Sequence, residues 1–239
     1  MTATERFITA GKGRIWACST GRGVPAILCN GGPGCCDYLA PVAAMIDDVA
    51  ESVRWEMRGC GRSSADESTT LQECIDDLDV VRAAYGHDQV VLIGHSWGPE
   101  LALAYALAYP QRVLGLIAIN GGGIVYDADW SARYRALRHH DETLDFLYAP
   151  NRTVNRSLNR STREFFRAPA IWARIARLPF PTVMLYGSDD IRPAWPAQQV
   201  ACLLPHGRFI AIPGAGHHPW LRQPARLADE LHHFFADLN

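Results

Sequence analysis

The sequence predicts an α/β fold built on a mostly parallel, doubly wound sheet, with one helical insertion. Short apolar stretches of strand length alternate with longer stretches whose apolar residues recur at helical spacing. The strand stretches in the body of the chain are mostly apolar, and 90–93 is apolar at every position, as expected where helices cover both faces of a parallel sheet. The alternation stops near the middle of the chain and later resumes, which indicates an insertion into a single domain.

The expected elements follow one another in a regular order. We expect strands at 7–8, 14–18, 25–29, 53–57, 90–93, 113–119, 182–186 and 208–212. We expect helices at 39–48, 70–85, 100–109, 194–204 and 221–238. Glycines punctuate the first two strands, and the apolar residues of the second helix fall three or four positions apart.

The insertion is predicted from residues 124–178, which contain no apolar stretch of strand type. They contain aromatic-rich and arginine-rich segments of helical character, such as 161–176. We therefore predict one α/β core domain made of residues 1–123 and 179–239. Residues 124–178 would form a short helical cap on that core.

A five-residue motif carries the main functional prediction. Gly94-His95-Ser96-Trp97-Gly98 lies between the expected strand 90–93 and the helix that starts near Glu100. A serine hydroxyl is a poor nucleophile until it is exposed and paired with a base. A tight strand-to-helix turn holds a serine above the end of a sheet, and small flanking residues let strand and helix approach closely. We predict that Ser96 is a nucleophile; the alternative is a glycine-rich turn with a buried serine.

A glycine-rich loop after the strand 25–29 supplies a second part of the predicted site. Its sequence is Asn30-Gly31-Gly32-Pro33-Gly34. Glycines allow a backbone N–H to point into a site, and an oxyanion hole needs two such donors. We predict that these donors are the N–H groups of Gly32 and Trp97. Without the serine motif, an ordinary Gly-Pro turn would be the better interpretation of this loop.

These motifs resemble those of the α/β-hydrolase superfamily, and most closely the branch of proline iminopeptidases and their relatives. That branch carries an H-G-G-P-G loop, an R-G-x-G-x-S turn and a G-x-S-W-G nucleophile motif, which correspond here to 30–34, 58–63 and 94–98. The chain departs from the pattern at Asn30, where the branch has histidine, and at His95, where iminopeptidases often have glycine. The insertion is also short for an iminopeptidase cap. The resemblance implies the α/β-hydrolase fold and a serine hydrolase.

Two adjacent aspartates, Asp189 and Asp190, follow the strand expected at 182–186. In this superfamily the triad runs serine, acid, histidine along the chain. Acids at the end of a strand also lie where open α/β sheets bind ligands. In the family the acid usually lies three residues after the glycine that ends this strand, which selects Asp190. Asp189 stays the alternative, because only one of two adjacent aspartates can orient the histidine.

The loop after the last expected strand contains two histidines, His217 and His218. His217 follows a G-x-G sequence, as the catalytic histidine of the family does, and we predict it to be the base. His218 stands directly before a proline and is the weaker candidate. The simpler alternative is that both are solvated loop residues.

The predicted cap bears on the substrate. It contains ten arginines and six acids, together with several aromatic residues such as Trp130. Aromatic side chains facing the core would make a mostly apolar pocket, and Trp130 is a candidate substrate-binding residue. A solvated face is the favoured interpretation of the arginines, over a dedicated carboxylate site. An aminopeptidase must bind a free α-ammonium group, for which Glu142 and Glu164 are the candidate acids.

The predicted reaction is hydrolysis of a small ester or amide through an acyl-enzyme intermediate, with an N-terminal prolyl amide among the options. Hydrolysis of a carbon–carbon bond or of a lactone by the same triad is the alternative. A non-catalytic ligand-binding protein is disfavoured, because every triad position is filled. No cofactor is predicted, since serine, base and oxyanion hole suffice for acyl transfer. No metal is predicted, because His, Asp and Cys residues are not clustered at metal-ligand spacing.

Composition limits the partners and the compartment. The net charge of -2 shows no basic excess, so we expect a small-molecule substrate and no nucleic acid. No stretch approaches the roughly 18 apolar residues of a membrane span, and the first residues form no apolar leader. The seven cysteines match no metal-ligand spacing, and we expect reduced, mostly buried thiols in the cytoplasm. Monomer and homo-oligomer both stay open.

Overall fold

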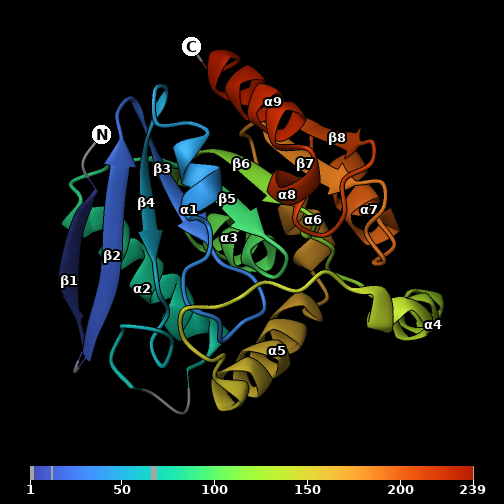
Figure 1. Cartoon of the computed structure of the whole chain (residues 1–239), viewed down its shortest axis with the longest axis horizontal. Coiled ribbons are helices and arrows are strands. Elements are labelled where there is room, and N and C mark those ends of the chain that lie inside the picture. The colour runs from blue at the N-terminus through green and yellow to red at the C-terminus, as the bar shows by residue number, and fades with distance from the viewer. Residues whose placement is uncertain (1–2, 12, 66–68, 239) are drawn as a thin grey trace.

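The computed structural model describes residues 3–11, 13–65 and 69–238. Its strands are β1 (Thr4–Ala10), β2 (Gly13–Gly21), β3 (Val24–Cys29), β4 (Ala50–Trp55), β5 (Val90–His95), β6 (Val113–Ile119), β7 (Thr182–Gly187) and β8 (Gly207–Ile212). They form one sheet in the order β1-β2-β4-β3-β5-β6-β7-β8 (Figure 1). Strand β2 is antiparallel to both of its neighbours, and the other neighbouring pairs are parallel. The prediction of a mostly parallel sheet is confirmed.

Helices cover both faces of this sheet. They are α1 (Ala40–Ala44), α2 (Leu71–Ala84), α3 (Gly98–Ala108), α4 (Ala128–Leu137), α5 (Arg152–Phe166), α6 (Ile171–Ile175), α7 (Trp195–Leu203), α8 (Pro219–Arg222) and α9 (Pro224–Ala236), with 3-10 turns at Pro110–Arg112 and Arg138–His140. Buried side chains of α2, α3 and α7 form one apolar cluster with the sheet. Those of α1, α8 and α9 form a second cluster on the other face. The doubly wound arrangement is therefore confirmed as well.

Two expected helices are shorter than predicted. The helix expected at 39–48 ends at Ala44, because the chain must turn there to enter β4. The carbonyls of Asp47 and Val49 in this turn accept the N–H groups of Arg22 and Val24 at the start of β3. The helix expected at 221–238 is divided into α8 and α9, because Pro224 starts a new helix and lacks the N–H that a continuous helix needs.

The segment from 124 to 178 contains helices and no strand. The bounds predicted for the helix at 161–176 were wrong. Helix α5 begins earlier, at Arg152, and the predicted helix is interrupted between α5 and α6, where Pro169 lies. The side chain of Asn151 caps α5 by accepting the N–H groups of Thr153 and Val154.

Helix α5 is anchored to the core. Val154, Leu158 and Phe166 are buried in the same apolar cluster as α2 and α3. The hydroxyl of Ser161 also accepts the N–H of Leu71 at 3.0 Å. Burial of each large apolar side chain contributes roughly 1.5–3 kcal/mol. This helix is therefore a fixed wall of the molecule, one of whose faces points away from the core.

The turn at 58–63 that resembles the family motif has a structural role. Its Arg62 guanidinium donates to the buried carboxylate of Glu56 at 2.6 Å. The hydroxyl of Ser63 donates to the Glu56 carbonyl at 2.6 Å and accepts the Trp16 N–H at 3.0 Å. These contacts tie the segment after β4 to β2.

All seven cysteines are free thiols, and six of them are buried while Cys202 is exposed. None of the helices in the described part of the chain is long and apolar enough to cross a bilayer. Met1 and Thr2, which open the stretch expected to lack a leader, lie outside the described residues.

The fold brings the predicted site loops to one edge of the sheet. The parallel strands β3, β5, β7 and β8 all end at that edge, because parallel neighbours run in the same direction. The loops that follow them contain the glycine-rich segment, the serine turn, the paired aspartates and the paired histidines.

Candidate active site

Ser96 lies in a tight turn between β5 and α3. Its φ of 59° is in the left-handed region, which costs an L-residue roughly 1–2 kcal/mol. Its N–H donates to the carbonyl of Ile119 at 2.9 Å, which fixes the turn to β6. A Cβ added to Gly94 would lie 2.3 Å from the Pro99 nitrogen, and one added to Gly98 would lie 2.0 Å from the Cys29 carbonyl oxygen. Both glycines of the motif are therefore required by the close approach of strand, turn and helix.

The structure brings Ser96, His217 and Asp190 into one hydrogen-bonded row. The Nε2 atom of His217 lies 3.0 Å from the Oγ of Ser96. The Nδ1 atom lies 2.7 Å from Oδ2 of Asp190. An ionised carboxylate only accepts hydrogen bonds, so it holds the imidazole proton on Nδ1 and leaves Nε2 free to accept the serine hydroxyl.

Asp190 is fully shielded from solvent and is held ionised by its donors. Burial by itself would raise its pKa. Hydrogen bonding to His217 and the nearby charge of Arg192 outweigh that effect and lower the pKa to about 2. The adjacent Asp189 is exposed, and its carboxylate accepts the hydroxyl of Ser188 instead. The structure thus places Asp190, and not Asp189, against the histidine.

Asn120 is a buried residue at this site that the sequence patterns did not reveal. It follows β6 with a φ of 48°. Its side-chain amide donates to Asp190 Oδ2 at 2.7 Å and to the Gly216 carbonyl at 3.2 Å. Its side-chain oxygen accepts the Gly187 N–H at 3.2 Å. One side chain therefore connects the acid to the loops on either side of it.

Arg192 connects the acid to the segment after α4. Its backbone N–H donates to Asp190 Oδ1 at 3.0 Å, and its guanidinium lies 3.2 Å from the same oxygen. The guanidinium also donates to Asp141 at 2.8 Å. The side chain of Asp190 accordingly has donors on both of its oxygens.

His95, the residue before Ser96, bridges two of the site loops. Its Nε2 lies 2.8 Å from the carbonyl oxygen of His217, so Nε2 carries the proton and donates. Its Nδ1 accepts the hydroxyl of Tyr38 at 2.7 Å, and that hydroxyl in turn accepts the N–H of Gly31. Burial and the neighbouring histidines hold the pKa of His95 well below its ordinary range. A neutral His95 thus links the glycine-rich loop to the loop of His217.

His218 lies beside His217 but is held by Glu142. Its N–H donates to Oε2 of Glu142 at 2.9 Å. Burial and the adjacent His217 lower the pKa of its imidazole to about 4. The guanidinium of Arg222 lies 2.8 Å from the other oxygen of Glu142. A Cβ on Gly216 would lie 2.2 Å from that same oxygen, so this glycine permits the contact.

Three histidines, His95, His217 and His218, come together although they are not at metal-ligand spacing along the chain. One ring nitrogen from each lies within 4.8 Å of the others. Both nitrogens of His95 and both of His217 already have partners in the hydrogen bonds described above. The arrangement fits hydrogen bonding, and the expectation that no metal is bound stays a prediction.

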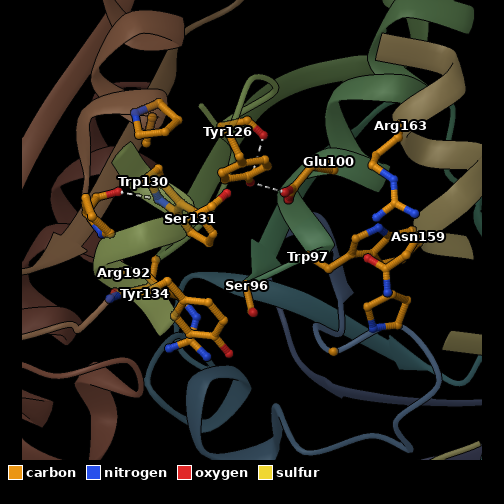
Figure 2. A pocket seen from close by; sticks show the side chains of 18 of the residues that line it. Ser96, Trp97, Glu100, Tyr126, Trp130, Ser131, Tyr134, Asn159, Arg163 and Arg192 are labelled. Carbon is orange, nitrogen blue, oxygen red and sulfur yellow. Dashed lines mark hydrogen bonds between the residues drawn. The ribbon is translucent and has the colours of Figure 1, made fainter. Parts of the chain in front are cut away.

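Ser96 opens into two cavities. The larger has a volume of about 870 Å³, and the smaller has a volume of about 260 Å³. Figure 2 shows Ser96 between an aromatic side formed by Trp130 and Tyr134 and an opposite side with Asn159 and Arg163 of α5. The predicted oxyanion donors Gly32 and Trp97 also line the larger cavity.

The three residues between 124 and 178 that were predicted to bind substrate lie in different places. Trp130 lines the larger cavity and donates its indole N–H to the Pro193 carbonyl at 3.0 Å. Glu142 lines the smaller cavity. Glu164 is exposed on α5 and is not among the lining residues of either cavity.

Glu100 is a carboxyl group on the cavity wall that the sequence motifs did not single out. It lies on α3, four residues after Ser96, and is buried. Burial raises its pKa to about 8, and the hydroxyl of Tyr126 lies 2.6 Å from one of its oxygens. Its other oxygen has no hydrogen-bond partner among the described residues. At neutral pH this group is therefore largely uncharged.

Comparison with known proteins identifies the family. A family model described as the alpha/beta hydrolase fold matches residues 25–144, half of the chain. The chain belongs to the α/β-hydrolase superfamily. Proline iminopeptidases are among its sequence relatives, in line with the resemblance stated from the motifs.

This α/β hydrolase is similar to several proline iminopeptidases. It is 38% identical over 100 residues to the one from Saccharolobus solfataricus, which is 40% of this chain and 32% of that relative. The match thus spans about a third of the relative's length. It is 23% identical over 289 aligned residues to the one from Lactobacillus delbrueckii subsp. bulgaricus, covering 97% of both.

Solved structures share the fold. A proline iminopeptidase from Mycobacterium smegmatis has a TM-score of 0.75 at 17% identity, covering 98% of both chains. A thermophilic esterase from Thermogutta terrifontis has a TM-score of 0.77 at 22% identity, covering 100% of this chain and 99% of the other.

Proposed function

We propose that the chain is a serine hydrolase that uses Ser96, His217 and Asp190 to hydrolyse a small ester or amide. The observation that carries this proposal is the continuous hydrogen-bonded row from the serine through the histidine to the buried aspartate. The row ends at a cavity large enough for a small molecule.

The proposed reaction proceeds in two halves. The Oγ of Ser96 attacks the substrate carbonyl carbon while its proton passes to Nε2 of His217. The carbonyl oxygen becomes an oxyanion, which accepts hydrogen bonds from the N–H groups of Gly32 and Trp97. His217 then gives the proton to the leaving group, and the acyl group remains on the serine. Water repeats the sequence, releases the acid and restores the free hydroxyl.

We further propose that residues 124–178 act as the cap of this site, on the core formed by 1–123 and 179–239. The cap residues Trp130 and Tyr134 lie on one side of the cavity. The contact of Arg192 with Asp141 joins this segment to the acid of the row. The cap thus supplies walls and the core supplies the reacting groups.

Ester hydrolysis is favoured over removal of an N-terminal residue. A free α-ammonium group needs an ionised carboxylate that is not already paired. Glu142 is paired with Arg222, and Glu164 faces solvent away from both cavities. Glu100 is largely uncharged at neutral pH. A prolyl amide is the second candidate, because relatives of this chain are named proline iminopeptidases.

A panel of chromogenic substrates tests the proposal. p-Nitrophenyl esters of rising chain length are assayed beside the p-nitroanilides of proline and alanine, with the Ser96→Ala variant as control. We expect ester turnover that is lost in the variant, and no anilide turnover. A clear preference for the prolyl anilide would assign a peptidase. A serine that is reactive toward neither series would favour a lactone or a carbon–carbon bond substrate.

A further inference from the structure

We propose that the larger cavity binds a carboxylate on the substrate through the arginines of α5, so that the hydrolysed ester or amide carries a remote carboxylate. This inference rests on the proposed function and specifies its substrate class. The sequence alone favours a solvated face for these arginines. The position of α5 beside the cavity of Ser96 favours a ligand-binding role instead.

Helix α5 turns two different faces to its surroundings. Its apolar residues Val154 and Leu158 are buried against the core. Arg156, Arg160 and Arg163 line the cavity that contains Ser96. Arg160 follows Arg156 by four positions, and Arg163 follows Arg160 by three. The three arginines therefore share one face of the helix and converge on one region of space. Figure 2 shows Arg163 beside Asn159 on the side of the cavity across from Trp130.

The charges of these arginines are not balanced by acids of the cavity. The guanidinium of Arg156 donates to the Thr153 hydroxyl at 3.4 Å, and neither Arg160 nor Arg163 forms an ion pair with a described residue. Glu100 is the acidic residue among those that line this cavity, and burial raises its pKa to about 8. At neutral pH this wall of the cavity is therefore positively charged.

Arg192 differs from the arginines of α5 although it lines the same cavity. Its guanidinium is paired with Asp141 and Asp190, so it belongs to the framework of the site. The α5 arginines are exposed and retain their donors for a ligand. A guanidinium presents two parallel N–H groups that match the two oxygens of a carboxylate. A cationic substrate, in contrast, would meet like charges at this wall.

The opposite wall accommodates an apolar spacer between the two ends of such a substrate. Trp130 and Tyr134 pack against each other with ring centroids 5.3 Å apart and line the cavity together. An ester carbonyl at Ser96 and a carboxylate at α5 would then be joined by a chain that lies along these rings. The fitting substrate is thus a half-ester of a dicarboxylic acid, or an amide of the same shape.

The test compares pairs of substrates that differ in one charge. Mono-4-nitrophenyl esters of adipic, suberic and sebacic acid are each assayed beside their methyl esters, and kcat/KM of the acid is divided by that of its methyl ester. We measure this ratio in the wild type, in Arg160→Gln/Arg163→Gln, and in Arg152→Gln/Arg167→Gln. Arg152 and Arg167 flank the same helix, are exposed and line neither cavity.

We expect the ratio to exceed one for at least one chain length in the wild type. Contacts of exposed charges are worth a few-fold each, so the ratio should fall about 5- to 20-fold in Arg160→Gln/Arg163→Gln. It should stay within about two-fold in the flanking variant, and it should fall with added salt only where the cavity arginines are present. An equal ratio in all three proteins would overturn the inference.

A binding measurement keeps this inference separate from the proposed function. Suberate and dimethyl suberate are titrated into Ser96→Ala while the fluorescence of the cavity tryptophans is followed. We expect suberate to bind more tightly than its diester, and the difference to disappear when Arg160→Gln/Arg163→Gln is added. Equal binding before and after that change refutes the carboxylate site. If suberate binds as expected but the wild type hydrolyses no ester, only the proposed reaction is refuted. The same holds if ester turnover survives in Ser96→Ala.

Discussion

Replacing Asp190 by asparagine removes the acceptor that orients His217, the base of the proposed reaction. In the wild type, Oδ2 accepts from His217 and from Asn120, while Oδ1 accepts from Arg192. An asparagine amide has one oxygen and one NH₂ group. Whichever way it is turned, its NH₂ meets a donor of the surrounding residues, and neither orientation satisfies the site. The N–H groups of Arg192 can only donate, so the amide oxygen turns to Arg192 and the NH₂ to His217. The imidazole then accepts at Nδ1 and carries its proton on Nε2, which cannot accept the serine proton.

The expected loss follows from that change of tautomer. A wrong tautomer in a Ser-His-Asp site costs about 10⁴ in kcat, or about 5.5 kcal/mol of barrier at 1.36 kcal/mol per tenfold. Asp189→Asn is the matched control, because that neighbouring carboxylate is exposed and contacts Ser188. We expect its kcat/KM to stay within about three-fold of the wild type.

The assay is steady-state hydrolysis of p-nitrophenyl acetate by both variants, with circular dichroism to verify folding. A larger loss in Asp189→Asn than in Asp190→Asn would reverse the assignment of the acid. Equal, small losses in both would show that neither carboxylate orients the base, and the account of the row would be wrong.

Three further predictions concern the groups around the row. Asn120→Ala should lower kcat about 10-fold with little change in KM, because Asp190 and the Gly216 carbonyl lose the hydrogen bonds that Asn120 donates. Steady-state kinetics measure the two constants separately. His95→Ala should lower the free energy of unfolding in urea by about 1–3 kcal/mol, since the Tyr38 hydroxyl loses its acceptor and the His217 carbonyl its donor; an unchanged midpoint would contradict the bridging role. Glu100→Gln should become steadily more stable than the wild type as the pH rises from about 5 to 8. The pKa of Glu100 is raised in the folded state, so unfolding releases a proton in that window, and the gap should grow by about 1.4 kcal/mol per pH unit at most. Urea melts at several pH values measure it, and a constant gap would show that Glu100 is ionised in the fold.

The fold was predictable because the amino-acid composition of its strands can be recognised in the sequence. The buried strands β5, β6 and β7 are mostly apolar, and strands covered on both faces in a parallel sheet show that pattern. The helix bounds were less predictable. The first half of helix α5 is largely polar, with Val154 and Leu158 as its apolar residues, so it gave little periodic signal.

The residues of the site were also predictable only in part, depending on whether they belong to a sequence motif. Ser96, Asp190 and His217 lie in motifs with fixed order, and a sequence pattern can find them. Asn120 and Tyr38 are single polar residues at the ends of a strand and of a loop, and only the packing of distant segments gives them partners. No spacing rule connects residues that far apart in the chain.

The arginines of the cap illustrate a different limit. Along the sequence, a solvated helix face and a ligand-binding face have the same composition. Which one is present depends on whether that face points to solvent or to a cavity. In this fold Arg160 and Arg163 lie at the cavity of Ser96, while Arg152 and Arg167 do not.

The most direct test of the central claim is the reaction of Ser96 with a fluorophosphonate, followed by intact mass. The serine oxygen displaces fluoride from phosphorus, so the mass should rise by one adduct, and the modified peptide should contain Ser96. Ser131→Ala, which changes another serine of the same cavity, should react like the wild type. Ser96→Ala should gain no mass. An adduct that persists in Ser96→Ala, or a wild type that gains none, would contradict the assignment of Ser96 as the nucleophile.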